Sequence, residues 1–303
     1  MEYLSSDREQ FKIVIDRMIS KSTLEPGIIE KDYYVSMILK GIAEKFDFSV
    51  FKGGTSLQKC HRVISRFSED IDITIDSALS QGKKRKLKYG IVDIASELGM
   101  SILNLDDTRS RNDYNKYELK YDSVLDGESE TVQPVVILET SFTEVSFPTV
   151  VMPVHSYIGD FLAEEAPDIL ENYGLIPFDM KVQGLDRTLV DKVFAICDYY
   201  MNGRVKKHSR HIYDIYKILP LVPQDEEFRK LVNDVREVRS KKSICPSAMP
   251  GINIPEMLEK IIEEKVYKDD YDNLTSRLLE ERVSYDDAIA AVKSIAISGM
   301  FSG

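Results

Sequence analysis

Three carboxylates in this sequence have the spacing to act together: Asp70, Asp72 and Glu139. Asp70 and Asp72 alternate with isoleucines in DIDITI (70–75), which predicts a strand with one acidic and one apolar face. Their side chains would project to the same side, about 7 Å apart along the strand. Such charges repel each other unless a cation lies between them, and oxygen ligands of this kind suit Mg²⁺. Glu139, in the apolar run VVILETSF, would add a third acid from a neighbouring strand.

A pair of glycines, Gly53-Gly54, stands between a predicted short strand and a predicted short helix. Backbone without side chains can bring N–H groups close to a phosphate, and Thr55 and Ser56 can add hydroxyl donors. We expect Thr55 or Ser56 to cap the helix. A phosphate-binding turn followed by two alternating acids is the minimum for nucleotidyl transfer from an NTP. The simpler interpretation is an ordinary turn followed by a strand with a polar face.

The composition fits a globular protein of one large or two ordinary domains, with 303 residues, 43% hydrophobic content and a net charge of −11. The negative charge excludes a bulk polyanion binder. Basic clusters at 83–88, 204–210 and 239–242 are candidate local nucleic-acid contacts or ordinary solvated surfaces. Three cysteines form no CxxC pair. No signal core and no run of 18 apolar residues occur, so we expect a cytoplasmic protein without a membrane span.

Hydrophobic periodicity places strands in the first part of the chain and helices after them. Strands are predicted at 48–54, 70–75, 116–124, 132–142 and 178–184, and helices at 7–20, 25–46, 55–64, 84–100, 185–203 and 209–219. The rest is predicted to be helical apart from a Pro/Gly-rich break at 245–255. We therefore expect an α+β fold, with an N-terminal domain (1–184) built on a mixed β-sheet flanked by helices and an α-helical C-terminal domain (185–303).

The motif residues resemble the nucleotidyltransferase superfamily of DNA polymerase β-like enzymes. That superfamily carries a glycine followed by glycine or serine, then two alternating acids, then a lone acid between hydrophobic residues. Here these elements read FKGGTS, DIDI and LET. The sequence is more similar to the AbiEii/AbiGii toxin family, through KGGTSLQKCHRVISRFSEDIDITI and through IIEKDYYVSMIL, TLVDKVFAICDYY and SRHIYDIYKI. The resemblance covers roughly residues 25–220 and implies a nucleotidyltransferase fold for the N-terminal domain.

The resemblance also implies an activity and its partners. The reaction would be Mg²⁺-dependent, with Mn²⁺ as a second candidate ion, and would transfer NMP from an NTP to an acceptor hydroxyl with release of pyrophosphate. The acceptor would be an RNA such as a tRNA 3′ end. The setting would be the toxin half of a toxin–antitoxin pair in abortive infection, a phage defence. A cognate antitoxin, or its DNA-binding partner, would then be the protein partner.

Individual roles follow from the same resemblance. The metal ligands would be Asp70, Asp72 and Glu139. Lys192 and Asp214 would complete the catalytic set, Lys192 by contacting the triphosphate and Asp214 by orienting a base, a lysine or the substrate. His211 stands where an acid is common in the family. The nucleotide-binding residues would be Lys52, Gly53, Gly54, Thr55, Ser56, Arg66 and Ser68, the last two in the loop that should cover the nucleotide.

Two other functions and three plainer assignments stay open. The enzyme could modify a protein or a small molecule, or the chain could be a catalytically silent module that binds NTP or a partner. Lys192 could be an ordinary exposed lysine. Asp214 could be a surface acid paired with Arg210, and Arg66 could simply pair with Glu69.

Overall fold

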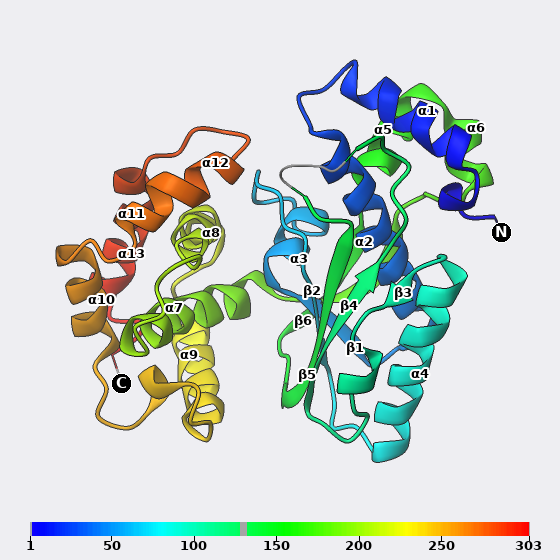
Figure 1. The fold of residues 1–303 in the computed structure, drawn as a ribbon. Helices are drawn as coiled ribbons and strands as arrows, with labels where there is room; N and C mark the ends of the chain where they lie inside the picture. The colour runs from blue at the N-terminus through cyan, green and yellow to red at the C-terminus, as the bar shows by residue number, and fades with distance from the viewer. Residues whose placement is uncertain (1, 128–131, 303) are drawn as a thin grey trace. The chain divides into compact units, whose positions relative to one another are not determined.

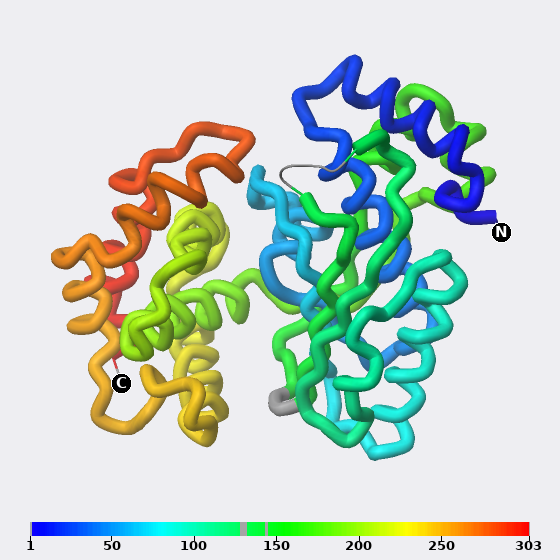
Figure 2. Tube along the Cα trace, in the orientation of Figure 1, coloured from blue at the N-terminus to red at the C-terminus, as the bar shows by residue number. Residues whose placement is uncertain are grey.

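A computed structural model describes residues 2–127 and 132–302, and the chain divides into two compact units (Figure 1; the same view as a tube in Figure 2). We call Met1–His61 with Ser68–Val182 the sheet unit, and Arg62–Phe67 with Gln183–Gly303 the helical unit. The chain therefore enters the helical unit twice, first for a short segment and then for its C-terminal part.

The sheet unit is built on one mixed seven-stranded sheet, which confirms the predicted α+β class. Strand β2 pairs antiparallel with β1 and parallel with β5, and β4 pairs antiparallel with β5. Two strands that were not predicted, β3 and β6, lie at the edges. The strands run in the order β3 (Ser101–Ile102), β4 (Tyr114–Lys120), β5 (Val135–Val145), β2 (Ile71–Ile75), β1 (Ser49–Lys52), β7 (Phe178–Gln183) and β6 (Thr149–Val154).

The bounds of β4 and β5 differ from the prediction for a local reason. Strand β4 ends at Lys120 because the chain beyond it turns to the buried Glu30 carboxylate, which accepts bonds from Ser123 Oγ at 2.6 Å and Val124 N at 2.7 Å. Strand β5 begins only after Pro134, which has no N–H to donate to a ladder. Burial raises the pKa of Glu30, and its two hydrogen bonds partly offset this.

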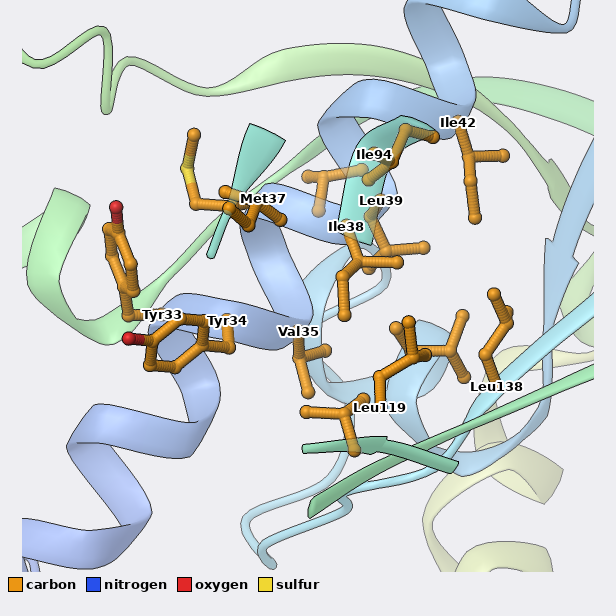
Figure 3. Close-up of a cluster of buried hydrophobic side chains, with 14 of the residues drawn as sticks. Tyr33, Tyr34, Val35, Met37, Ile38, Leu39, Ile42, Ile94, Leu119 and Leu138 are labelled. Carbon is orange, nitrogen blue, oxygen red and sulfur yellow. The ribbon is translucent and has the colours of Figure 1, made fainter. Parts of the chain in front are cut away.

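One large apolar core joins the helices of this unit to the sheet. Helix α2 packs against α4 and β5, and Figure 3 shows Val35 and Leu39 of α2 close to Leu119 of β4 and Leu138 of β5. All four are fully buried, and such a side chain contributes about 1.5–3 kcal/mol when it leaves water. The helices are α1 (Arg8–Ile19), α2 (Pro26–Lys45), α3 (Gly53–Lys59), α4 (Gln81–Glu97), α5 (Tyr157–Glu165) and α6 (Pro167–Asn172).

Helix α3 begins earlier than predicted. It starts at Gly53 with Lys52 as its N-cap residue, and no side chain caps it. The prediction that Thr55 or Ser56 caps this helix is therefore wrong, because both lie inside its first turn. Gly53 has a φ of +82°, a left-handed conformation that glycine adopts without strain, and this allows the helix to start directly at the end of β1.

The helical unit contains the predicted C-terminal helices. Helix α7 ends before Gly203, whose φ of +65° is the left-handed conformation that commonly ends a helix. Helix α13 packs against both α8 and α10. Among the described residues, no helix is long and apolar enough to cross a membrane. The helices are α7 (Leu185–Met201), α8 (Arg210–Ile218), α9 (Glu226–Ser240), α10 (Ile254–Glu263), α11 (Lys268–Asp270), α12 (Ser276–Leu278) and α13 (Tyr285–Ile297).

Candidate active site

Asp72 and Glu139 are direct neighbours across two parallel strands. Asp72 of β2 is the register partner of Glu139 of β5, and on its other side it is paired with Lys52 of β1. Residues in register on adjacent strands project to the same face of a sheet. Ile71 and Ile73 point to the opposite face, where both are buried. The sheet therefore gathers two acids and a lysine on one face over an apolar core.

Gly53 lies against the carboxylate of Asp72. A Cβ built on Gly53 would overlap Asp72 Oδ2 and would lie 3.0 Å from its Cγ. Any other residue would strain the backbone, because of its positive φ, and would also displace the carboxylate. The glycine turn and the acidic strand therefore pack directly against each other. The position of the Asp72 carboxylate depends on a glycine at residue 53.

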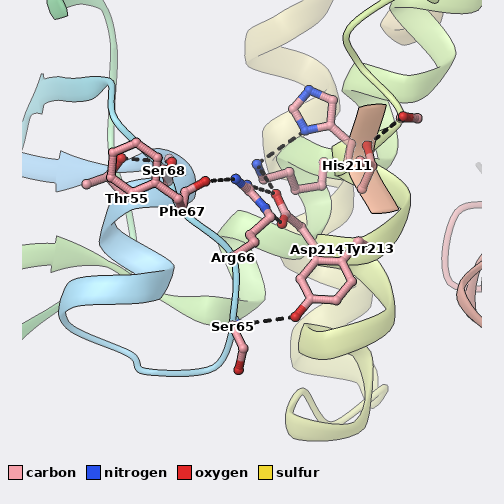
Figure 4. Close-up of polar contacts among 12 residues, drawn as sticks. Thr55, Ser65, Arg66, Phe67, Ser68, His211, Tyr213 and Asp214 are labelled. Atoms are coloured by element: carbon pink, nitrogen blue, oxygen red, sulfur yellow. Dashed lines mark hydrogen bonds and ion pairs between the residues drawn. The ribbon is translucent and has the colours of Figure 1, made fainter. Parts of the chain in front are cut away.

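The hydroxyls of Thr55 and Ser68 connect the glycine turn to the chain that enters β2 (Figure 4), and a third hydroxyl, of Ser56, bonds within the turn. Thr55 Oγ1 donates to the carbonyl of Asp70 at 2.5 Å and lies 2.9 Å from Ser68 Oγ. Ser56 Oγ donates to the carbonyl of Gly53 at 2.9 Å. All three side chains are buried. Their main effect is to hold the turn beside the first acid, so the backbone N–H groups of the turn are the better candidates for contacting a phosphate.

Tyr114 is a site residue that the sequence did not indicate. It is the first residue of β4 and pairs with Ser141 of β5. Lys116, two residues further along β4, pairs with Glu139. Since side chains two residues apart share a face, Tyr114 lies on the same face as Glu139. Burial raises the pKa of Tyr114, and so do the charge of Glu139, a hydrogen bond to Glu139, and the charges of the two aspartates. All three acids therefore contribute to the raised pKa of Tyr114. The predicted strand began at residue 116 and left Tyr114 outside it.

The acids fit a divalent cation held together with phosphate. Among residues 2–127 and 132–302, no group of three or more His, Cys, Asp or Glu side chains is arranged to hold a metal by itself. Mg²⁺, however, is usually bound by one or two carboxylates together with phosphate oxygens and water. Asp72 and its register partner Glu139 supply that number, and Asp70 stands two residues away. All of their donors are oxygens, as Mg²⁺ and Mn²⁺ prefer.

A second group of predicted residues meets in the helical unit (Figure 4). Arg66 forms a two-point ion pair with Asp214, with Nε–Oδ1 at 2.8 Å and Nη2–Oδ2 at 2.9 Å. Lys192 Nζ lies 2.8 Å from Asp214 Oδ2. Burial alone would raise the pKa of Asp214, but the charges of Arg66 and Lys192 hold it well below its usual range. Burial lowers the pKa of Lys192, and the charge of Asp214 opposes this.

The segment around Arg66 is fixed by the rest of the helical unit. Ser65 N donates to Tyr213 Oη at 3.1 Å, and Ser65 O accepts from Glu280 N at 2.9 Å. Arg66 also forms an isolated antiparallel bridge with Leu279. Two residues later, Ser68 already belongs to the sheet unit.

The plainer assignments for these charged residues are wrong. Lys192 is buried rather than an ordinary exposed lysine, and Asp214 is fully buried rather than a surface acid paired with Arg210. Arg66 pairs with Asp214 instead of Glu69, which forms an ion pair with Lys31.

The three basic clusters differ in what their side chains do. In the cluster at 83–88, Lys84 pairs with Asp113 at 2.5 Å, whereas Lys83, Arg85 and Lys86 are exposed. The guanidinium of Arg85 lies 5.5 Å from the ring centroid of Tyr89, which is 53% exposed and so forms part of the same surface. The cluster at 204–210 also has three exposed cations, Arg204, Lys206 and Lys207.

The cluster at 239–242 is partly structural. Arg239 pairs with Asp198 at 2.7 Å and stacks on Phe194, and Lys241 pairs with Glu237 at 3.1 Å. This cluster is therefore the weakest candidate for contacting nucleic acid.

Comparisons with known proteins agree with this geometry. Residues 38–291 match the family model described as nucleotidyl transferase AbiEii toxin of a type IV toxin–antitoxin system. No curated protein sequence matches the chain. Among solved structures, MenT4, a nucleotidyltransferase toxin from Mycobacterium tuberculosis H37Rv, is similar with a TM-score of 0.52 and 13% identity, over 95% of this chain and 88% of MenT4. This likeness confirms the predicted nucleotidyltransferase fold.

A second solved structure is more distant. It is an H. pylori protein described as a candidate nucleotidyltransferase, with a TM-score of 0.44 and 13% identity over 90% of this chain and 94% of that one.

Proposed function

The chain belongs to the AbiEii family of nucleotidyl transferase toxins of type IV toxin–antitoxin systems, and we propose that it transfers NMP from an NTP to the hydroxyl of an RNA. The acceptor oxygen forms a bond to the α-phosphorus, the bond from the α-phosphorus to the bridging oxygen breaks, and pyrophosphate leaves. The proton of the acceptor hydroxyl passes to water. The observation that carries this proposal is the contact of Gly53 with Asp72, which joins a phosphate-binding turn to an acidic strand.

The residues of the sheet unit bind and orient the nucleotide. Backbone N–H groups at Gly53 and Gly54 contact phosphate oxygens, and Lys52, beside Asp72 in the register, adds a positive charge. Asp70, Asp72 and Glu139 would hold Mg²⁺, or Mn²⁺ in its place, together with phosphate oxygens. The ion would neutralise phosphate charge and so favour departure of pyrophosphate. Tyr114 donates its hydroxyl to Glu139 and holds that carboxylate in orientation.

The residues of the helical unit contribute a cation for the triphosphate. Lys192 is held by Asp214, and Asp214 is held in turn by the two-point contact with Arg66. Two cations and one acid leave one positive charge in excess, which favours binding of an anion. The side chain of Lys192 is 10% exposed, so it is buried but not completely enclosed.

An RNA acceptor fits the exposed basic surfaces. Lys83, Arg85 and Lys86 are exposed on α4, and the ring of Tyr89 lies beside Arg85. Such a combination of cations and an aromatic ring suits phosphates and unstacked bases. The 3′ end of a tRNA is the acceptor that we propose. We also place the protein in the cytoplasm, as the toxin of a phage-defence pair with its own antitoxin.

Label transfer tests this function. The protein is incubated with each α-labelled NTP, Mg²⁺ and, separately, total tRNA, other RNA, proteins and small-molecule hydroxyl acceptors. We expect label on RNA with the wild type and with Glu165→Gln, a control acid that pairs with Lys21 on the surface of the sheet unit. We expect none with Asp70→Ala. Transfer only to protein or small molecules would replace the RNA acceptor, and NTP binding without transfer to any acceptor would favour a silent module.

A further inference from the structure

His211 makes a polar contact that the reaction proposed above does not use. Its Nδ1 lies 3.2 Å from Lys192 Nζ, and the same ammonium lies 2.8 Å from Asp214 Oδ2. An ammonium has three N–H donors and no acceptor, so Lys192 donates and His211 accepts. The imidazole must therefore be neutral, with its proton on Nε2.

A stack of three rings holds the imidazole in this orientation. The ring of Tyr199 lies 3.5 Å from that of His208 and 5.7 Å from that of His211, with interplanar angles of 9° and 7°. The two imidazoles are themselves nearly parallel, at 2°. Burial lowers the pKa of His211 well below its usual range, and the charge of Lys192 lowers it further, which agrees with a neutral ring.

The net charge of Arg66, Lys192 and Asp214 explains why a neutral acceptor for Lys192 matters. Arg66 and Lys192 are positive and Asp214 is negative, so the three carry one positive charge in excess. A carboxylate at position 211 would also accept a bond from Lys192, but it would cancel this excess. Histidine accepts the bond and leaves the charge in place.

We propose that His211 is a positioning residue, which holds the ammonium of Lys192 in one place while preserving its charge for an anionic ligand. This inference rests on the proposed function, because it takes Lys192 as the contact to the triphosphate. It adds the neutral acceptor that, together with Asp214, fixes the ammonium.

Three substitutions of His211 separate the effect of the hydrogen-bond acceptor from the effect of its charge. His211→Asn keeps a neutral oxygen acceptor near the position of Nδ1, His211→Leu removes the acceptor, and His211→Asp keeps an acceptor but adds a negative charge. Dissociation constants for the Mg²⁺ complexes of ATP, CTP, GTP and UTP are measured by calorimetry, and Tm is measured for each variant. His155→Asn in the sheet unit, where His155 contacts Asp160 at 2.9 Å, is the matched control.

We expect His211→Asn and the control to bind the preferred NTP within about threefold of the wild type, and His211→Leu to bind about tenfold more weakly. We expect His211→Asp to bind at least as weakly as His211→Leu although its Tm is unchanged or higher, because the new acid relieves the excess positive charge. A purely structural role predicts instead that His211→Asp, with its Tm retained, binds NTP as tightly as the wild type.

Lys192→Ala distinguishes a failure of the positioning role of His211 from a failure of the proposed contact between Lys192 and the triphosphate. If Lys192→Ala weakens NTP binding while His211→Leu and His211→Asp bind like the wild type, the positioning role is wrong and the proposed function stands. If Lys192→Ala binds as the wild type does, or if the wild type binds no NTP, the proposed role of Lys192 is overturned and the inference falls with it.

Discussion

Arg66 and Asp214 are 148 positions apart in the sequence, yet they form a fully buried two-point ion pair with distances of 2.8 and 2.9 Å. A bidentate contact of this kind fixes both side chains in one plane and suits arginine rather than lysine. It also attaches the short segment Arg62–Phe67 to helix α8. The residue that holds Lys192 in place is therefore held itself.

Breaking this pair should be costly. Arg66→Ala leaves Asp214 buried with one fewer cation, and we expect a loss of about 3 kcal/mol in the free energy of unfolding, measured by urea denaturation. Lys217→Ala, which breaks the partly exposed pair of Lys217 with Glu281, should cost less than about 1 kcal/mol. Equal losses in the two variants would show that the buried pair has no special role.

Gly53→Ala should abolish nucleotidyl transfer. The added Cβ would overlap the Asp72 carboxylate, so we expect the rate of label transfer to fall at least about 100-fold, since small misplacements of reacting groups have effects of this size. Gly251→Ala is the matched control, because Gly251 has a φ of +84° and no atom within 4 Å of its added Cβ. It should show only the backbone strain, about 1 kcal/mol of stability, and normal transfer. Equal activity in the two variants would contradict a role for the contact.

The phenol of Tyr114 should support the metal site. Tyr114→Phe removes the hydroxyl that bonds to Glu139, and loss of such a supporting hydrogen bond lowers metal affinity by about tenfold or more. Electron paramagnetic resonance of bound Mn²⁺ in the presence of NTP would measure this. Tyr173→Phe, which removes a similar hydroxyl bonded to Asp7 at 2.9 Å, should leave Mn²⁺ affinity unchanged. Unchanged affinity in Tyr114→Phe would exclude the supporting role.

Stability should fall in mild acid because of His211. Its pKa is lowered in the folded chain, first by burial and then by the charge of Lys192. Below about pH 6.5 the unfolded chain binds a proton at this position and the folded chain does not, so stability decreases as the pH falls, by up to about 1.4 kcal/mol per pH unit. His208, whose pKa is also lowered, first by burial, adds to the same effect. His211→Asn should therefore show a shallower decrease between pH 6.5 and 5.

Asp214 should act in a separate pH range. Its pKa is lowered in the folded chain, so its contribution to stability is present above the ordinary carboxyl value of about 3.9 and is lost only below it.

Identical pH profiles for the wild type and His211→Asn between pH 6.5 and 5 would contradict a neutral His211.

Local patterns in the sequence were sufficient to predict the strands and helices that carry the site. The alternation of acids with isoleucines at 70–75 reflects a period of two, and a sheet that buries one face imposes that period on the strand. The helices at α2 and α7 followed from their apolar spacing and from Pro26 and Gly203.

Contacts between distant segments were out of reach of such patterns. Tyr114 joins the acids through the register of β4 with β5, which pairs two separate segments of the chain. The pairing of Arg66 with Asp214 involves two segments with no shared periodicity. The start of α3 at Gly53 depends on a positive φ, which the glycine permits but its neighbours do not reveal.

Transfer of NMP by these acids is tested most sharply by comparing the products of Asp72→Asn with those of the wild type, with α-labelled NTP and tRNA as substrates. We expect the wild type to form labelled RNA and pyrophosphate in equal amounts, and Asp72→Asn, which keeps the size of the side chain next to Gly53, to form both at least about 100-fold more slowly. Equal rates for the two proteins, or release of orthophosphate in place of pyrophosphate, would contradict transfer of NMP by the acids beside the glycine turn.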